Sequence, residues 1–207
     1  MCWNASISFN TYIFSLFASI FAYINNTLQF NSFMFIQSFA TMQLVEYFIW
    51  SKTFSNSSLS KAGLALIISQ PFFSIIRLNN SQYLLPLLFG YLIYCVILLL
   101  FLHPIQNIDF RSIPYNNGHL SWKWLFSKEI TIPWMIFLLF PFYLKHEYLT
   151  LCFALISYII TFILFYKAKT VGSMWCWFIN ITSIFFIANV FWKDLRKIPN
   201  YFSSYLV

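Results

Sequence analysis

The stretch SQYLLPLLFGYLIYCVILLLFLH, residues 81–103, decides the fold class of this chain. It contains the apolar run VILLLFL at 96–102 and has no Asp, Glu, Lys or Arg. A helix needs about 20 apolar residues to cross the hydrocarbon layer of a bilayer. Because lipid offers the backbone no hydrogen-bond partners, a segment that crosses it must satisfy its own backbone groups. We therefore expect residues 81–103 to form a transmembrane helix.

Six further stretches have the same apolar character, and together they predict an all-α polytopic membrane protein with seven transmembrane helices in one bundle. The short stretch 132–144 carries Pro133 and Pro141, so we expect this span to be kinked, tilted or re-entrant. Residues 1–207 form a single predicted domain, with a basic juxtamembrane tail at 193–207. Besides 81–103, the predicted spans are residues 8–24, 30–50, 59–78, 132–144, 148–166 and 172–192.

The composition of the 207-residue chain agrees with a membrane location. It is 60% hydrophobic and 23% aromatic, and only 8% of its residues are charged, whereas soluble domains have about 25%. The lipid bilayer is therefore the expected partner. The net charge of +7 does not indicate nucleic acid binding, because the basic residues lie between apolar stretches and form no basic run. The four cysteines show no close spacing, so neither a redox motif nor a disulfide framework is predicted.

Seven spans place the helix ends alternately on two membrane faces. We call the face at which the chain begins face A and the opposite one face B. The long connection 103–131 is expected on face A. The Lys and Arg residues divide too evenly between the faces for the positive-inside rule to fix the orientation.

Residues capable of chemistry gather at face A. Glu46 is the only carboxylate well inside a predicted span, where an ionisable group is costly, and Gln43 lies one turn before it. Glu46 is interpreted as a proton carrier, a cation ligand or a general base; alternatively, it bonds another helix or reaches the interface. The candidate pocket residues are Cys2, Trp3, Asn4, Gln43, Glu46, Gln70, His119, Trp122, Trp175, Cys176 and Asn180.

Three predicted spans carry rows of polar side chains. Helix packing explains such rows, although buried amides such as Gln70 and Asn180 also orient ligands. The three rows are Ser8, Tyr12, Ser15 and Ser19; Gln70, Ser74 and Arg77; and Gly172, Cys176, Asn180 and Ser183.

The loop NNGHLSWKW, residues 116–124, contains an Asn-Gly turn signal. If a short helix follows Gly118, His119 and Trp122 share one of its faces. Histidine is the natural side chain for proton transfer near neutral pH. The alternative is that both residues lie at the headgroup level, where aromatic side chains concentrate.

No metal or cofactor is predicted. Cys2, Glu46, His119 and Cys176 are ligand types that suit zinc. They are separated by most of the chain, however, and no local pair of ligands exists.

Five segments together carry a resemblance to a known family. They are MCWNAS (1–6), FATMQLVEYFIW (39–50), SQPFF (69–73), NGHLSWKW (117–124) and GSMWCWF (172–178). Over most of its length the chain resembles a family of seven-span membrane proteins of giant DNA viruses that has more distant bacterial relatives. The Met-Cys-Trp start and the Trp-Cys motif are the most specific parts.

The resemblance implies a seven-span fold in a viral or host-cell membrane, and it implies no activity. The bacterial-type pattern has Glu-x-x-Gln in its second helix, whereas this chain has Gln43-x-x-Glu46. The pair still shares a helix face, but no fixed role for Glu46 carries over.

The sequence thus predicts an integral membrane protein with a polar pocket at face A that binds a small molecule or ion, as a transporter, channel or sensor does. The second, third and seventh helices form its walls, Cys2 and Trp3 its rim and the His119 loop its lid. One alternative is a membrane-embedded enzyme with Glu46 and His119 as acid and base on a lipid-like substrate. The other is a structural protein of a viral membrane, which tight packing around Glu46 would favour.

Overall fold

The computed structural model describes residues 4–79, 81–102, 110–116, 118–122 and 128–195, and it is mainly α-helical. Two short strands, β1 (Ile113–Pro114) and β2 (Leu120–Ser121), pair antiparallel. The helices are α1 (Ala5–Ile24), α2 (Phe30–Ser51), α3 (Asn56–Ile76), α4 (Leu84–Leu102), α5 (Lys128–Leu144), α6 (Tyr148–Phe165), α7 (Val171–Trp177) and α8 (Ile179–Leu195).

Each predicted span corresponds to helical structure, which confirms the all-α prediction. The last predicted span is divided into α7 and α8. Four segments are long and apolar enough to cross a membrane: Ala5–Ile24, Asn56–Ile76, Tyr148–Phe165 and Val171–Lys193. In α4 and α5 the apolar stretches are shorter, Leu84–Leu100 and Thr131–Leu144. Seven complete crossings therefore stay a prediction.

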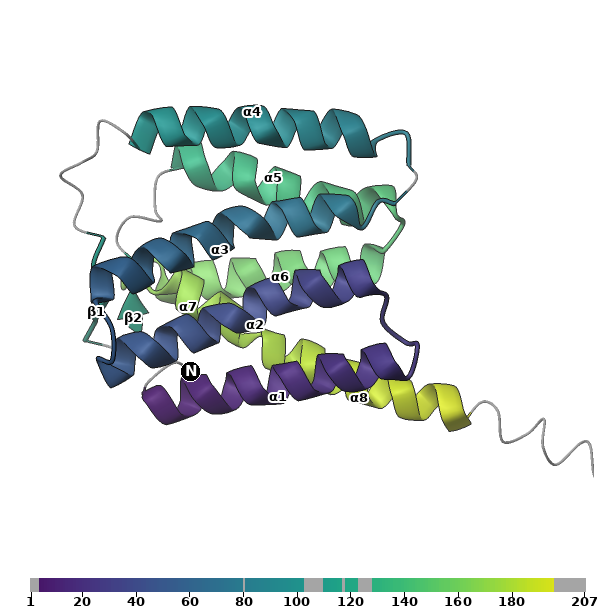
Figure 1. Cartoon of the computed structure of the whole chain (residues 1–207), viewed down its shortest axis with the longest axis horizontal. Coiled ribbons are helices and arrows are strands. Elements are labelled where there is room, and N and C mark those ends of the chain that lie inside the picture. Colours follow the sequence, from purple (N-terminus) through teal and green to yellow (C-terminus); the bar gives the residue numbers. More distant parts are fainter. Residues whose placement is uncertain (1–3, 80, 103–109, 117, 123–127, 196–207) are drawn as a thin grey trace, which may run out of the picture.

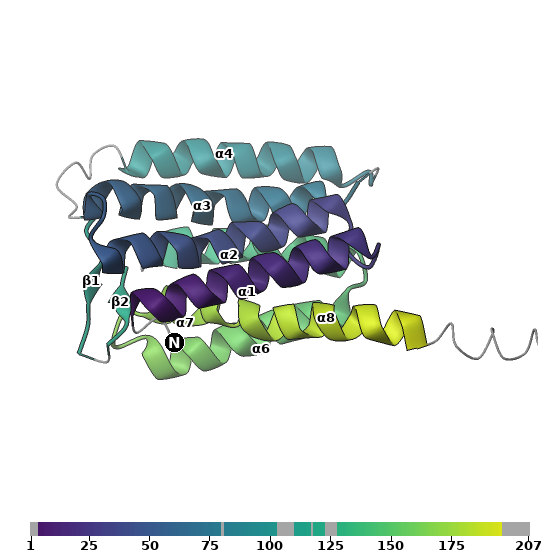
Figure 2. The ribbon, with the colours of Figure 1, turned by 60° about the horizontal axis from the view of Figure 1, so that its bottom comes forward.

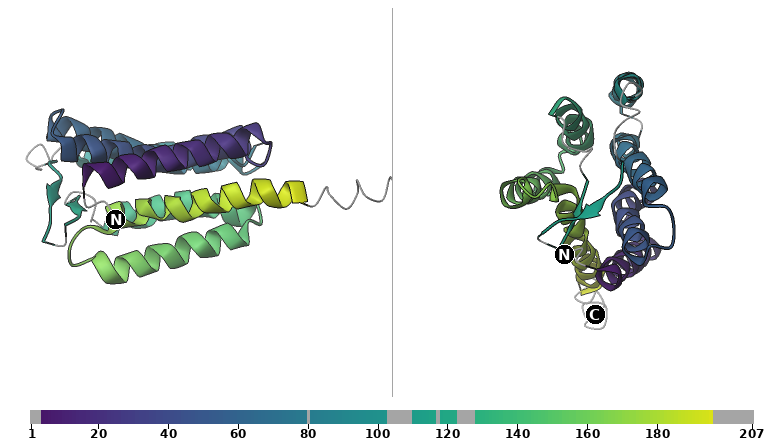
Figure 3. Two further views of the ribbon diagram at one scale, coloured as in Figure 1. Left: turned by 90° about the horizontal axis from the view of Figure 1, so that it is seen from below. Right: turned by 90° about the vertical axis from the view of Figure 1, so that its left-hand side faces the viewer.

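The long helices lie side by side along one direction (Figures 1 and 2). In the end-on view of Figure 3 they form two rows, α4–α3–α2–α1 and α5–α6–α7–α8. Contacts between α3 and α5, between α2 and α7, and between α1 and α8 join the rows. Leu85 of α4 and Ile163 of α6 are both 73% exposed, and their neighbours are also apolar. Exposed apolar surface of this extent is rare in soluble monomers and is typical of a surface that contacts a partner or a membrane.

The start of α1, the turn between α2 and α3, and the β1–β2 pair lie at one end of the bundle (Figure 1). This end corresponds to face A of the sequence analysis, and the candidate residues are built around it.

A half-buried ion pair ties the helices together at the opposite end, face B. Arg77 Nη2 donates to Glu147 Oε2 at 2.6 Å, and Arg77 Nε donates to Ser32 Oγ at 3.0 Å. The guanidinium carbon also lies 4.5 Å from the centre of the Phe142 ring and 5.4 Å from that of Phe35. This arrangement connects α2, α3 and the turn between α5 and α6.

The polar row predicted for the third span is fully used in helix packing. Gln70 Nε2 donates to the carbonyl of Ser38 in α2 at 3.5 Å, and Ser74 Oγ donates to the carbonyl of Leu138 in α5 at 2.7 Å. Together with Arg77, these side chains hold α3 between its two neighbours.

Candidate functional site

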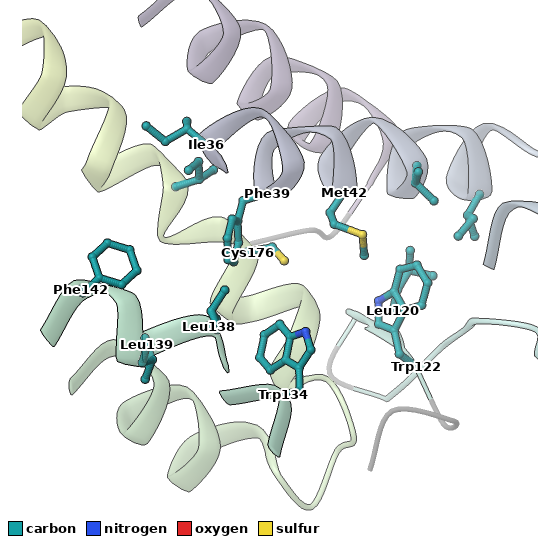
Figure 4. Packing of buried hydrophobic residues seen from close by; sticks show 13 residues of the cluster. Ile36, Phe39, Met42, Leu120, Trp122, Trp134, Leu138, Leu139, Phe142 and Cys176 are labelled. Atoms are coloured by element: carbon teal, nitrogen blue, oxygen red, sulfur yellow. The ribbon is translucent and has the colours of Figure 1, made fainter. Parts of the chain in front are cut away.

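The interior at face A begins with an apolar cluster that joins α2, α5, α7 and the β2 segment (Figure 4). Phe39 and Met42 come from α2, Trp134 from α5 and Cys176 from α7. In Figure 4 the Cys176 side chain lies among these residues, with Trp122 on the side of the hairpin. The cluster brings four sequence-distant segments to the same place.

Glu46 and Gln43 lie inside this region, and both side chains have 0% exposure. Glu46 is close enough to Cys176 of α7 to interact with it electrostatically. Its Cα lies five residues before the end of α2, so it is about 7–8 Å below the helix terminus at the helical rise of 1.5 Å per residue. The structure thus places the candidate carboxylate under the bundle end, beside α7.

The loop that precedes β1 is attached to the start of α3 by side-chain hydrogen bonds. Asn56 Nδ2 donates to the Ser112 carbonyl at 2.8 Å, and the Ser112 backbone N–H donates to Asn56 Oδ1 at 2.9 Å. The hydroxyls of Ser60 and Ser112 are 3.0 Å apart. These reciprocal bonds fix the hairpin over the end of the bundle.

Trp122 attaches the other side of the hairpin to α7 and α3. Its Nε1 donates to Ser173 Oγ at 2.8 Å, and that hydroxyl donates to the Leu120 carbonyl at 3.0 Å. The six-membered part of the indole lies against Gly63 of α3, where a Cβ atom would be 2.8 Å from Trp122 Cζ3. Trp122 is 1% exposed and is therefore enclosed between the hairpin, α3 and α7 at face A.

His119 is buried in the same hairpin, and its ring meets Phe165 of α6 edge-on with the ring centres 5.7 Å apart. Burial lowers the pKa of His119 below its ordinary value. The expectation of a short helix after Gly118 is wrong. The residues that follow form an extended strand, in which successive side chains alternate between faces, so His119 and Trp122 do not share a helix face.

The last predicted span contains a break that its sequence did not indicate. Phe178, with φ −60° and ψ −12°, separates α7 from α8. Asn180 Nδ2 donates to the Trp177 carbonyl at 3.1 Å and to Thr11 Oγ1 of α1 at 3.3 Å. Asn180 therefore covers a carbonyl at the break and connects it to α1. The polar row predicted along one continuous helix is divided at this point.

Trp175 connects α7 to α6 and to the apolar cluster. Its Nε1 donates to Ser157 Oγ of α6 at 3.0 Å, and its ring centre lies 5.9 Å from that of Trp134 and 5.6 Å from that of Phe39. These contacts make Trp175 part of the wall between α2, α5 and α6.

Other candidates lie elsewhere. Cys2 and Trp3 fall outside the described residues. Asn4 is exposed and is the N-cap of α1, because its Oδ1 accepts from the Ile7 backbone N–H at 2.9 Å. Gln70 bonds to Ser38, which is eight residues from Glu46 on α2, a distance of about 12 Å along the helix.

Sequence reasoning missed the residues that attach the β1–β2 hairpin and Trp122 to the helices. They are Asn56, Ser60, Gly63, Ser112 and Ser173. Gly63 had a usable signal, since the chain has only four glycines and a helical glycine often marks a close approach. Ser173 lies inside the GSMWCWF segment, next to the residues that were singled out.

The described residues contain no group of three His, Cys, Asp or Glu side chains that could hold a metal ion. Glu46 is a buried carboxylate with the Gln43 amide one turn away on α2 and the Cys176 thiol nearby on α7. Such a set can hold a proton, a small cation or a hydrogen-bond donor.

Comparisons of the chain with protein-family models, with curated proteins and with solved structures gave no match. The resemblance to a family of giant-virus membrane proteins therefore stays a prediction.

Proposed function

We propose that this protein is an integral membrane protein that binds a small cationic or hydrogen-bond-donating ligand beside Glu46, under the Trp122 lid at face A. The observation that carries the proposal is the complete burial of Glu46 and Gln43. An ionisable side chain within a membrane span is costly and by default marks a functional position.

The origin of the surrounding side chains supports the same proposal. Glu46 and Gln43 come from α2, Cys176 from α7 and Asn180 from α8, so several helices contribute to one level of the bundle. Ligand sites in helical bundles are built in this way, from side chains that face each other across the core. A buried carboxylate with an amide one turn away favours a ligand with positive charge or with donor groups.

A structural role is the second candidate function. The close packing of the Trp122 ring against Gly63 favours it. A lid that packs this closely is suited to hold helices together. In that case Glu46 contributes to assembly, and no ligand stabilises the protein.

The test is ligand-dependent thermal unfolding of the full chain in mild detergent. The probes are Na⁺, K⁺, Mg²⁺, Ca²⁺, ammonium and choline chlorides at constant ionic strength. A ligand at 100 times its Kd stabilises the folded state by about 2.7 kcal/mol. We expect at least one probe to raise the Tm of the wild type and to have no effect on Glu46→Gln.

Glu147→Gln is the matched control, because it removes an acid at face B. It should keep the ligand response of the wild type. Equal responses of the wild type and Glu46→Gln would refute the proposed site, and a wild type that responds to no probe would favour the structural role.

A further inference from the structure

The buried side of α1 is lined by hydroxyl groups from Ser8 to Ser19. Ser8, Ser15 and Ser19 have 0% exposure and Thr11 has 5%. Beyond Ser19 the next residue on this side is Ala22. Tyr12, which sequence spacing placed in this row, is only half-buried, and Thr11 takes its place. Figure 2 shows α1 between α2 and α8, so the row lies at the junction of three helices.

Two of the four hydroxyls, those of Ser19 and Thr11, have hydrogen-bond partners in the part of the protein that the structure describes, and the other two do not. Ser19 Oγ donates to the Leu16 carbonyl at 2.9 Å and accepts from Gln37 Nε2 at 2.6 Å. Thr11 Oγ1 accepts from Asn180. Ser8 Oγ and Ser15 Oγ are fully buried, yet they have no hydrogen-bond partner among the described residues.

Unpartnered buried hydroxyls call for a ligand, because buried polar groups in folded proteins are almost always paired with protein or with ordered water. A serine in a helix can bond to a carbonyl of the preceding turn, as Ser19 does. A buried water usually makes two to four hydrogen bonds. Ser8, Thr11 and Ser15 offer such partners at intervals of about one helical turn.

The register of α1 against α2 places this row at the level of Glu46. The Phe9 and Tyr47 ring centres are 5.0 Å apart, and Gln37 bonds Ser19. In an antiparallel pair these two contacts put Glu46 opposite the turn between Ser8 and Thr11. The same register puts Gln43 opposite the turn between Thr11 and Ser15.

We propose that water molecules bind along Ser8, Thr11 and Ser15, and that those at Ser8 and Thr11 carry protons between face A and Glu46. The inference rests on the proposed function and specifies its ligand: the proton is one cation that this site exchanges. Protons pass along this row of waters from one molecule to the next. The Glu46 carboxylate accepts one proton and later returns it. The row spans about 16 Å from Ser8 to Ser19 at 1.5 Å per residue, about half of a 30 Å hydrocarbon layer. The row starts near face A, passes the level of Glu46 between Ser8 and Thr11 and ends at Gln37, so it opens toward one face.

The first test uses alanine variants, which remove the hydroxyl without adding volume. If Ser8 and Ser15 hold water, Ser8→Ala and Ser15→Ala deprive that water of a partner and lower the Tm. If the two hydroxyls are dry, their removal eliminates an unpaired polar group and raises the Tm. A rise in Tm for both variants would overturn the proposal.

The second test follows the carboxyl band of Glu46 by infrared spectroscopy of the full chain in lipid nanodiscs, with the band assigned by its loss in Glu46→Gln. We expect hydrogen–deuterium exchange of this band to slow roughly tenfold or more in Ser8→Val, since a barrier increase of about 1.4 kcal/mol changes a rate tenfold. Ser69→Val is the control, because Ser69 is a half-buried helical serine on α3 that bonds the Leu66 carbonyl. Its exchange should match the wild type.

Unchanged exchange in Ser8→Val would overturn the row of waters. That outcome leaves the cation response of the wild type and its loss in Glu46→Gln in place. Failure of the row of waters and failure of the Glu46 site are therefore distinguishable.

Discussion

Substituting Gly63 by alanine tests whether Trp122 is seated as a lid against α3. A Cβ atom at position 63 would lie 2.8 Å from Trp122 Cζ3 and 2.9 Å from Trp122 Cη2, distances that carbon atoms do not tolerate. In a helix interior, alanine is otherwise favoured over glycine by about 1 kcal/mol. Overpacking a core costs about 1–3 kcal/mol. The two effects oppose each other, and we expect the clash to dominate.

Gly90 of α4 provides a matched comparison within the same protein. A Cβ atom there would lie 3.6 Å from the Phe137 ring, which is ordinary van der Waals contact. Gly90→Ala should therefore stabilise the fold by about 0.5–1 kcal/mol, and Gly63→Ala should leave it about 1–3 kcal/mol less stable than Gly90→Ala.

The assay is thermal or denaturant unfolding of both variants in the same detergent, together with the double variant Gly63→Ala, Trp122→Phe. Phenylalanine removes the outer ring atoms that clash, so the two substitutions should show a coupling energy of at least about 1 kcal/mol. A Gly63→Ala protein as stable as Gly90→Ala, or the absence of coupling, would refute the proposed seat of Trp122.

Further predictions concern the other fixed contacts. Ser173→Ala leaves the Trp122 indole N–H without its acceptor and should destabilise the fold by about 1–2 kcal/mol in the same unfolding assay; Ser173→Thr, which keeps the hydroxyl, should lose less. Glu147→Ala removes the carboxylate that Arg77 contacts and should lower the free energy of unfolding by about 1–3 kcal/mol. High salt should not destabilise the wild type by the same amount. Burial lowers the pKa of His119 in the folded state, so its contribution to stability is complete above the unfolded pKa of about 6.5. This contribution declines as the pH falls from there toward the lower folded pKa, and His119→Gln should show a weaker decline of Tm over the same pH interval.

The helices could be predicted from sequence because each apolar stretch is bounded by a polar or turn-forming pair. Asn25 and Asn26 end the first stretch, and in the structure Asn25 is the C-cap of α1 and Asn26 adopts a left-handed conformation with φ 54°. Hydrophobic length alone therefore located the helix to within a few residues.

The break at Phe178 could not be predicted in the same way. The surrounding segment contains no proline, and its apolar content is continuous. Next to the break, Asn180 bonds to Thr11 of α1, and such a contact exists only in the assembled bundle.

The candidate site was predictable in part. Glu46 and Gln43 stood out because polar groups are rare and costly within apolar spans, and the structure buries both. The conformation of the residues after Gly118 was misjudged. An Asn-Gly turn signal can be followed by a helix or by a strand. The choice is made by pairing of β2 with β1 and by the attachment of Trp122 to Ser173, neither of which is a local property of the sequence.

Native mass spectrometry tests the central claim, a ligand site that depends on Glu46, most directly, because it requires no prior choice of ligand. The wild type, Glu46→Gln and Glu147→Gln would be purified in mild detergent and released from micelles by activation. The account predicts a retained small adduct on the wild type and on Glu147→Gln that is absent from Glu46→Gln. The same spectrum for all three proteins, with or without an adduct, would contradict it.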